Sequence, residues 1–249
     1  AWHPIGCMPD ACWMHSWLIT GDDMSLKLIY FKMRALAEAP QMLMQCYDID
    51  YQYLMSWDHF DDVWANVKPK IAFQQLPILE VDGAEQICQS VAILQYLENR
   101  AGLAISDTVR AAQASAILQS AQELFAPLNP AINFAVGDDF IAKKEAMRPG
   151  LSSRFSDLAR CLEGSDGKFF TDNTPRAAEF ATYHHLDLSK FLDPSLIQEF
   201  PRLMGFIDDM ESLPGMATYL ANRPELIDVG VAPKLVIDDV VHPTGLKKS

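Results

Sequence analysis

Tyr30 is the first side chain in this sequence whose type and place could do chemistry. It stands near the end of the apolar, strand-like run 26–31. A phenol at such a position can donate one hydrogen bond to an anion, and a donor to a thiolate lowers the thiol pKa from its usual value near 8.5. The same residue also fits a tyrosine packed on a sheet with its hydroxyl in water, so Tyr30 alone decides nothing.

A proline loop, "QLPIL" at residues 75–79, comes directly before a second apolar strand. A cis bond before Pro77 would leave the backbone N–H and C=O of Leu76 free to pair with an extended peptide, as an added strand does. Cis bonds are uncommon even before proline, so we expect a trans bond here.

Gln89 and Ser90 begin an amphipathic helix. A helix N-terminus has unpaired N–H groups and a field that favours a carboxylate. The Ser90 hydroxyl and the Gln89 amide could add donors to such a site. Serine is also a common N-cap, so we expect Ser90 to cap this helix.

The elements that must position these residues alternate between strand and helix. A βαβ half followed by a ββα half predicts one compact α/β domain, in which the carboxyl ends of strands border the binding crevice. The expected elements are a strand at 26–31, a helix at 33–48 with a kink at Pro40, a strand at 48–55, a helix at 57–70, a hairpin at 76–89 turning at Asp82–Gly83, and a helix at 90–103 stopped by Gly102.

After residue 103 the periodicity becomes helical almost throughout, apart from a short extended piece at 168–170. The sequence therefore predicts an all-α second domain. The expected divisions are an N-terminal extension at 1–24, the α/β domain at 25–103, the helical domain at 104–230 and a C-terminal tail at 231–249.

The composition restricts the function. The 249 residues carry a net charge of −13, which repels phosphate backbones, so we expect no nucleic-acid partner. No apolar run reaches the roughly 20 residues that span a bilayer. Residues 1–24 lack the basic start of a signal peptide but are rich in tryptophan. They are open to three interpretations: an arm packed on the body, a segment that docks to a partner, or the start of a processed chain.

The five cysteines contain no CxxC pair, so we expect reduced thiols, while a Cys7–Cys12 disulfide stays open. His184 and His185 are adjacent in a helix, whereas helical metal pairs favour i, i+4 spacing. We therefore expect both histidines at the surface or in the core, and no metal site.

In their order and spacing, four stretches resemble the cytosolic glutathione transferases, most closely the sigma-like branch. They are "LKLIYFKMRALAE", "WANVKPKIAFQQLPILEVDG", "QSVAILQYLENRAGL" and "LPGMATYLANRP". The resemblance covers residues 25 to about 225. It implies a thioredoxin-like domain that binds glutathione, a helical domain that borders a hydrophobic electrophile, a homodimer, and a cytoplasmic location, with an organelle after removal of a targeting segment left open.

The resemblance also implies roles for individual residues. Tyr30 would stabilise the glutathione thiolate, and Met33 with Leu36 would border the second substrate. The remaining glutathione contacts would come from side chains and backbone of the first domain. They are Phe31, Arg34, Trp64 and Lys68 (the last two on one helix face, at the glycyl end), Gln75, Leu76 with Pro77 at the cysteinyl part, and Gln89 with Ser90 at the γ-glutamyl carboxylate.

Three positions depart from the pattern. Leu36 stands where a second arginine would lie near the thiolate, Gln74 stands where glycine is common, and "TPRAAEF" alters the acidic N-cap box of a late helix. Two hypotheses follow. The first is a glutathione transferase, with isomerase or peroxidase use of the same thiolate. The second is a non-catalytic subunit that docks to a partner through residues 1–24.

Overall fold

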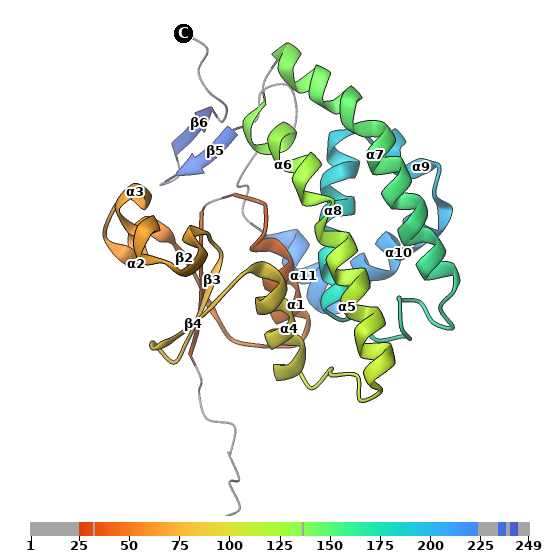
Figure 1. Cartoon of the computed structure of the whole chain (residues 1–249), viewed down its shortest axis with the longest axis horizontal. Coiled ribbons are helices and arrows are strands. Elements are labelled where there is room, and N and C mark those ends of the chain that lie inside the picture. Colours follow the sequence, from red (N-terminus) through yellow and green to blue (C-terminus); the bar gives the residue numbers. More distant parts are fainter. Residues whose placement is uncertain (1–24, 32, 136, 224–233, 238–239, 244–249) are drawn as a thin grey trace, which may run out of the picture.

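The first domain is built on a mixed sheet of four strands in the order β2-β1-β3-β4 (Figure 1). The computed structural model describes residues 25–31, 33–135, 137–223, 234–237 and 240–243. β1 pairs parallel with β2 and antiparallel with β3, and β3 pairs antiparallel with β4. The strands are β1 (Leu26–Tyr30), β2 (Gln52–Met55), β3 (Ile78–Val81) and β4 (Glu85–Cys88).

Two helices, α1 (Glu38–Cys46) and α4 (Ser90–Arg100), separate this sheet from the second domain. They contact each other, and both contact α8 of the helical domain, as Figure 1 shows. The short helices α2 (Ser56–Phe60) and α3 (Trp64–Val67) lie beside β2 at the outer edge of the sheet. This arrangement confirms the predicted thioredoxin-like domain.

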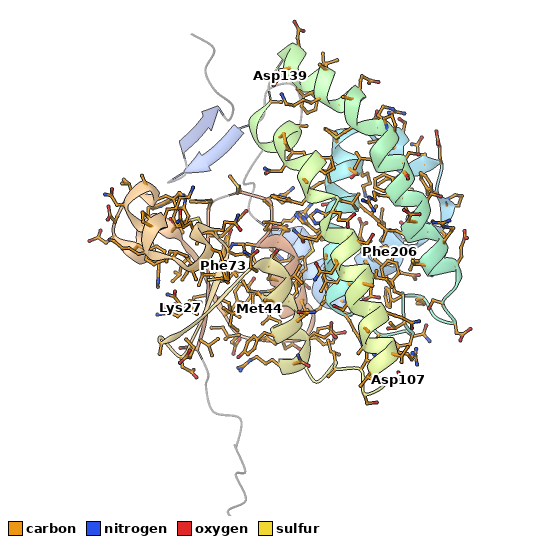
Figure 2. All side chains as sticks on the ribbon, in the orientation of Figure 1. Lys27, Met44, Phe73, Asp107, Asp139 and Phe206 are labelled. Atoms are coloured by element: carbon orange, nitrogen blue, oxygen red, sulfur yellow. The ribbon has the colours of Figure 1, made fainter. Side chains whose placement is uncertain are left out.

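The two central strands are buried on both faces, which explains why they read as unbroken apolar runs rather than as alternating ones. Leu28, Ile29, Ile78 and Leu79 are fully buried, and Met44 of α1 packs in the same core (Figure 2). The methionines of α1 therefore serve packing.

The helix expected from residue 33 begins only at Glu38, and the predicted kink at Pro40 is wrong. Pro40 is the third residue of α1. In the first turn of a helix a backbone N–H has no intrahelical partner, so proline costs nothing there. Residues 33–37 instead form turns that lead from β1 to α1.

The single helix expected at 57–70 is also wrong. Asp61 has a φ of 49° and ends α2, because a left-handed residue cannot continue a right-handed helix. The chain then forms α3 and two 3-10 turns, η1 (Lys68–Lys70) and η2 (Ala72–Gln74). The hairpin turn at Asp82–Gly83 is confirmed, since both residues have positive φ.

The second domain is all-helical, as predicted. The segment 168–170 bends without joining a sheet, so the extended piece expected there is wrong. The helices are α5 (Thr108–Gln122), α6 (Phe125–Phe134), α7 (Gly137–Glu163), α8 (Ala177–Leu192), α9 (Ser195–Gln198), α10 (Pro201–Glu211) and α11 (Pro214–Asn222). None of the helices in the described part of the chain has the length and hydropathy to cross a membrane.

The predicted C-terminal tail contains a hairpin, in which β5 (Lys234–Ile237) pairs antiparallel with β6 (Val240–Pro243). The N-terminal extension 1–24 lies outside the described residues. The domain boundaries at residues 103 and 230 stay predictions.

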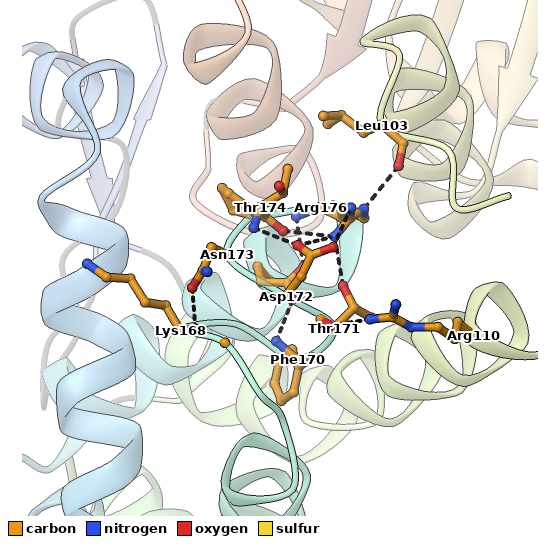
Figure 3. A network of polar contacts seen from close by, with 12 residues as sticks. Leu103, Arg110, Lys168, Phe170, Thr171, Asp172, Asn173, Thr174 and Arg176 are labelled. Atoms are coloured by element: carbon orange, nitrogen blue, oxygen red, sulfur yellow. Dashed lines mark hydrogen bonds and ion pairs between the residues drawn. The ribbon is translucent and has the colours of Figure 1, made fainter. Parts of the chain in front are cut away.

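A polar network holds the beginning of α8 (Figure 3). Arg176 donates from Nε to the carbonyl oxygen of Leu103 (3.0 Å) and pairs with the Asp172 carboxylate at 2.9 Å. The Glu179 carboxylate accepts hydrogen bonds from the backbone N–H groups of Arg176 (2.8 Å) and Phe170 (3.0 Å). In the altered N-cap box the Glu179 carboxylate therefore still accepts from the backbone N–H of the N-cap residue, although that residue is an arginine.

Candidate glutathione site

Tyr30 ends β1 and is only 4% exposed. Burial raises the pKa of its hydroxyl above the usual 10, while a hydrogen bond from the backbone N–H of Leu36 lowers it in part. Burial has the larger effect, so the phenol keeps its proton at neutral pH. Tyr30 can therefore act as a hydrogen-bond donor to an anion at this end of the sheet.

An aromatic chain connects Tyr30 to α3. The ring of Phe31 lies 5.6 Å from that of Tyr30 and meets Trp64 edge-on at 5.5 Å. The Tyr53 hydroxyl donates to the carbonyl oxygen of Phe31 at 2.9 Å and so fixes the backbone after β1. Sequence reasoning missed Tyr53. Its only signal was its place on β2, the strand paired with β1.

Gln75 and Gln89 meet, although fourteen residues separate them. Nε2 of Gln89 donates to Oε1 of Gln75 at 3.2 Å, and both side chains are exposed. Gln89, with φ 73° and ψ 121°, is the N-cap of α4, so the expected N-cap at Ser90 is wrong. β4 ends at Cys88 and the chain turns at Gln89. The buried Ser90 is therefore the first residue of α4. No side chain caps α4, so its first N–H groups lack a side-chain partner.

The trans bond expected at Leu76–Pro77 is wrong, since this peptide is cis. Both residues are buried and precede β3, which begins at Ile78. The backbone of Leu76 therefore lies outside the ladder that joins β3 to β1 and β4. Just before it, Phe73 and Gln74 have φ of 61° and 53°, the region that glycine adopts most readily. The resemblance led us to expect glycine at the position of Gln74, and this backbone is one that glycine adopts with less strain than glutamine.

Arg34, in the turns after β1, has a carboxylate partner. Its Nε is 3.7 Å from Oε1 of Glu38, a carboxylate that is only 1% exposed. Burial raises the pKa of Glu38, and the charges of Arg34 and Arg223 lower it. The guanidinium of Arg34 therefore compensates a buried charge at the start of α1.

Met33 and Leu36 are half-buried in the turns after β1 and pack against the core. Lys68 is exposed, and its backbone N–H donates to the carbonyl oxygen of Trp64, so the two residues are one turn apart. The structure thus brings Tyr30, Phe31 and Trp64 together through ring contacts, and it joins Gln75 to Gln89, the residue before Ser90. Phe73, labelled in Figure 2, lies in the loop before Gln75 and is 70% exposed.

A cavity of about 430 Å³ lies elsewhere, between the end of α1 and the beginning of α11. Cys46, Pro175 and Gly215 are among its lining residues, and none of the predicted site residues lines it. Side-chain chemistry and helix geometry, rather than cavity volume, therefore mark the candidate site.

The remaining titratable candidates belong to the core. His184 and His185 are fully buried in α8, as one of the two expected placements. Within the described ranges, no group of three or more His, Cys, Asp or Glu side chains could hold a metal ion. Cys46, Cys88 and Cys161 are free thiols, whereas Cys7 and Cys12 lie outside the described residues.

Comparisons with known proteins agree with this geometry. The glutathione S-transferase N-terminal domain matches residues 26–99, and the glutathione S-transferase C-terminal domain matches residues 130–223. Glutathione S-transferase 1 of Ascaris suum is 28% identical over 205 residues, covering 80% of this chain and 97% of that protein. The hematopoietic prostaglandin D synthase of Gallus gallus is 32% identical over 205 residues, covering 80% and 96%.

Among solved structures, the glutathione S-transferase from Ascaris lumbricoides superposes with a TM-score of 0.72 at 27% identity. The superposition covers 81% of this chain and 98% of the Ascaris lumbricoides chain. Both domains of the chain, in this order, thus match one family over nearly the whole length of its relatives. The chain belongs to the glutathione S-transferase family.

Proposed function

We propose that the protein conjugates glutathione to a hydrophobic electrophile, with Tyr30 as the donor that stabilises the thiolate. The observation that carries this proposal is the pairing of a buried, protonated phenol at the end of β1 with an uncapped helix start at α4. A phenol that keeps its proton can donate to a thiolate, and an uncapped helix N-terminus can bind a carboxylate. Glutathione has both groups.

The rest of the tripeptide would be bound by the first domain. Gln75, Gln89 and Ser90 would bind the γ-glutamyl carboxylate at the start of α4. The backbone of Leu76, before Pro77, would pair with the cysteinyl part, because it lies outside the β3 ladder. The glycyl end would contact Trp64 and Lys68, and Phe31 with Arg34 would complete the surroundings.

In the chemical step the thiol gives its proton to solvent, and the thiolate sulfur forms a bond with an electrophilic carbon of the second substrate. Either a leaving group departs from that carbon with its bonding pair, or the electron pair of an attacked double bond takes up a proton from water. Tyr30 keeps its proton and donates a hydrogen bond to the sulfur, which favours the thiolate before attack. Met33 and Leu36, both half-buried, would border an apolar second substrate. Leu36 supplies no positive charge, so we expect the thiolate to be less stabilised here than beside a guanidinium.

The proposal also covers the class of the protein, its oligomeric state and its location in the cell. We place the chain in the sigma-like class, as a homodimer in the cytoplasm. Its relation to a hematopoietic prostaglandin D synthase makes prostaglandin D synthesis a second reaction to assay with the same thiolate.

The test is Tyr30→Phe, which removes only the hydroxyl. Conjugation should fall at least tenfold while the far-UV spectrum and the melting temperature stay close to wild type. Tyr96→Phe is the matched control, because its buried hydroxyl has no hydrogen-bond partner and lies in the middle of α4. Equal activity of Tyr30→Phe and wild type would contradict the proposed role.

Leu36 also favours the second hypothesis, a binding subunit without catalysis that docks to a partner through residues 1–24. Isothermal titration with glutathione separates the two, because an enzyme must bind it. Glutathione binding with measurable conjugation supports the enzyme. No binding, together with a partner interaction that is lost on deletion of residues 1–24, supports the subunit.

A further inference from the structure

A buried cation joins the first turn of α1 to the second domain. Nη1 of Arg223, the residue after α11, lies 3.4 Å from Oε1 of Glu38. Its Nη2 lies 3.1 Å from Oδ2 of Asp187 on α8. The side chain of Arg223 is 11% exposed and that of Asp187 only 4%. One guanidinium therefore bridges two buried carboxylates from different helices.

Glu38 depends on this bridge. Burial raises its pKa, and Arg34, Arg223 and a hydrogen bond from the Tyr219 hydroxyl lower it again. Without Arg223, Glu38 keeps only Arg34 as a cation partner, and a buried carboxylate with less compensation takes up a proton or moves toward water. Either response would change the geometry of the turn that begins α1.

That turn leads directly to Tyr30. Glu38 is the first residue of α1, and its backbone N–H donates to the carbonyl oxygen of Ala35 at 3.0 Å. The residue inside this turn, Leu36, donates its backbone N–H to the Tyr30 hydroxyl. The carbonyl of Ala35 and the N–H of Leu36 belong to one peptide group. The backbone N–H of Glu38 therefore sets the orientation of the N–H from which the Tyr30 oxygen accepts.

We infer that Arg223 is a positioning residue: through Glu38 it holds the Leu36 amide against the Tyr30 hydroxyl. A phenol that accepts a hydrogen bond is a better donor to a thiolate, so loss of this alignment raises the pKa of bound glutathione. The inference rests on the proposed function. It explains how the last helix of the second domain affects a site built from the first.

The primary variant is Arg223→Gln, which removes the guanidinium and its charge and leaves a shorter, polar side chain. Amide hydrogen exchange of the peptide 31–37 should accelerate at least fivefold. In the glutathione complex, the thiolate absorbance should titrate at least 0.5 pH units higher than in wild type. The kcat at neutral pH should fall about threefold or more while KM for glutathione stays within twofold. Arg223→Lys should recover more than half of each change.

The matched control is Arg148→Gln, because Arg148 also pairs with a carboxylate, Asp193, at 2.5 Å, but within the second domain. It should leave the exchange of 31–37 and the thiolate titration unchanged. If Arg223→Gln fails to fold, Tyr219→Phe removes a single hydroxyl from Glu38 and should shift both readouts in the same direction by a smaller amount.

Exchange and titration that match wild type in a folded Arg223→Gln or Tyr219→Phe protein would overturn the inference. If the proposed function is wrong, the measurements give a different result. In that case the wild type shows no thiolate signal, and the exchange of 31–37 alone decides whether Arg223 orders the turn.

Discussion

Gln89 donates a hydrogen bond to Gln75 across 3.2 Å, and this contact joins the loop before β3 to the uncapped start of α4. We expect both amides to contact the γ-glutamyl end of glutathione. Gln75→Ala and Gln89→Ala should each weaken binding by about 1 kcal/mol, or roughly fivefold in Kd, as for one lost hydrogen bond. Isothermal titration measures both.

The two effects should not add. Because each glutamine orients the other, the double variant should lose less than the sum of the single losses, by about 0.5 kcal/mol or more. Gln86→Ala, an exposed glutamine within β4, is the control and should bind as wild type. Strict additivity would show that the contact has no role in binding.

Leu36→Arg should stabilise the thiolate of bound glutathione and so lower the pKa of its thiol. A guanidinium near a partly buried anion lowers a pKa by about 1–2 units. The thiolate absorbance of the glutathione complex should therefore appear at lower pH, and conjugation at pH 6.5 should rise. Leu36→Gln is polar but uncharged, and it separates charge from polarity. If the two variants titrate alike, the apolar residue at this position is not what limits the thiolate.

Gly215→Ala should disturb the packing of α11 against the end of α1 and lower the free energy of unfolding. A Cβ at Gly215 would lie 2.6 Å from Cα of Cys46 and 2.7 Å from the carbonyl oxygen of Gln45, so the helices would have to move apart. Overpacking of this kind costs about 1–3 kcal/mol in the free energy of unfolding. Gly205→Ala, inside α10 with open space around it, should instead stabilise by about 0.5–1 kcal/mol. Urea denaturation of both proteins tests the contrast.

Gln74→Gly should stabilise the fold. Gln74 has a φ of 53°, a conformation that costs an L-residue about 1 kcal/mol relative to glycine. Glycine also gains entropy in the unfolded chain, so the net increase should be about 0.5 kcal/mol. Gln75→Gly, at an extended φ of −139°, lacks this relief and should destabilise. Melting curves that rank the two variants in the opposite order would contradict this reason.

His185 should make the protein acid-sensitive. Burial lowers its pKa from 6.5 to about 4. Below pH 6.5 the unfolded chain binds a proton that folded His185 does not, so stability falls as the pH drops from about 6.5 to 4, by about 3 kcal/mol at most. His185→Phe removes this loss. Urea denaturation between pH 4 and 8 should show a smaller acid-side decrease in the variant.

Glu179 has the opposite effect and must be considered with His185. Burial raises its pKa to about 7, so its ionisation costs stability as the pH rises from about 4.5 to 7. The total pH dependence therefore mixes these two groups with other buried groups whose pKa is shifted, among them His184, next to His185, and Glu38. The difference between wild type and His185→Phe removes the contribution of Glu179, and a difference that does not change with pH would contradict the prediction for His185.

The order of elements could be predicted because each had a local signal: period-two or apolar strands, helical spacing, and Gly102 or Asp82–Gly83 at the ends. Two of the errors arose where the backbone takes positive φ at a residue other than glycine. Asp61 ends α2 inside the expected helix, and Gln89 takes the N-cap position expected for Ser90. Their sequence neighbourhoods favour continued helix or extended chain, and tertiary contacts decide otherwise.

The residue assignments at the candidate site stay predictions. Its residue types and order indicated Tyr30, the proline loop and the start of α4. The contacts that orient them, such as the Tyr53 hydroxyl on Phe31 and Arg223 on Glu38, join residues 22 and 185 positions apart. No local pattern shows such pairs, because the first depends on how β2 pairs with β1 and the second on how the second domain packs on the first.

The beginning of α8 is completed by the first domain. The Glu98 carboxylate, on α4, accepts from the Ala177 N–H at 3.0 Å, and Arg176 donates to the carbonyl oxygen of Leu103. The helical half cut off after residue 103 would lose the Glu98 partner, and its central helix would begin with an unpaired N–H. We therefore expect the two halves to unfold in one cooperative transition, and the helical half to be less stable alone than in the intact chain.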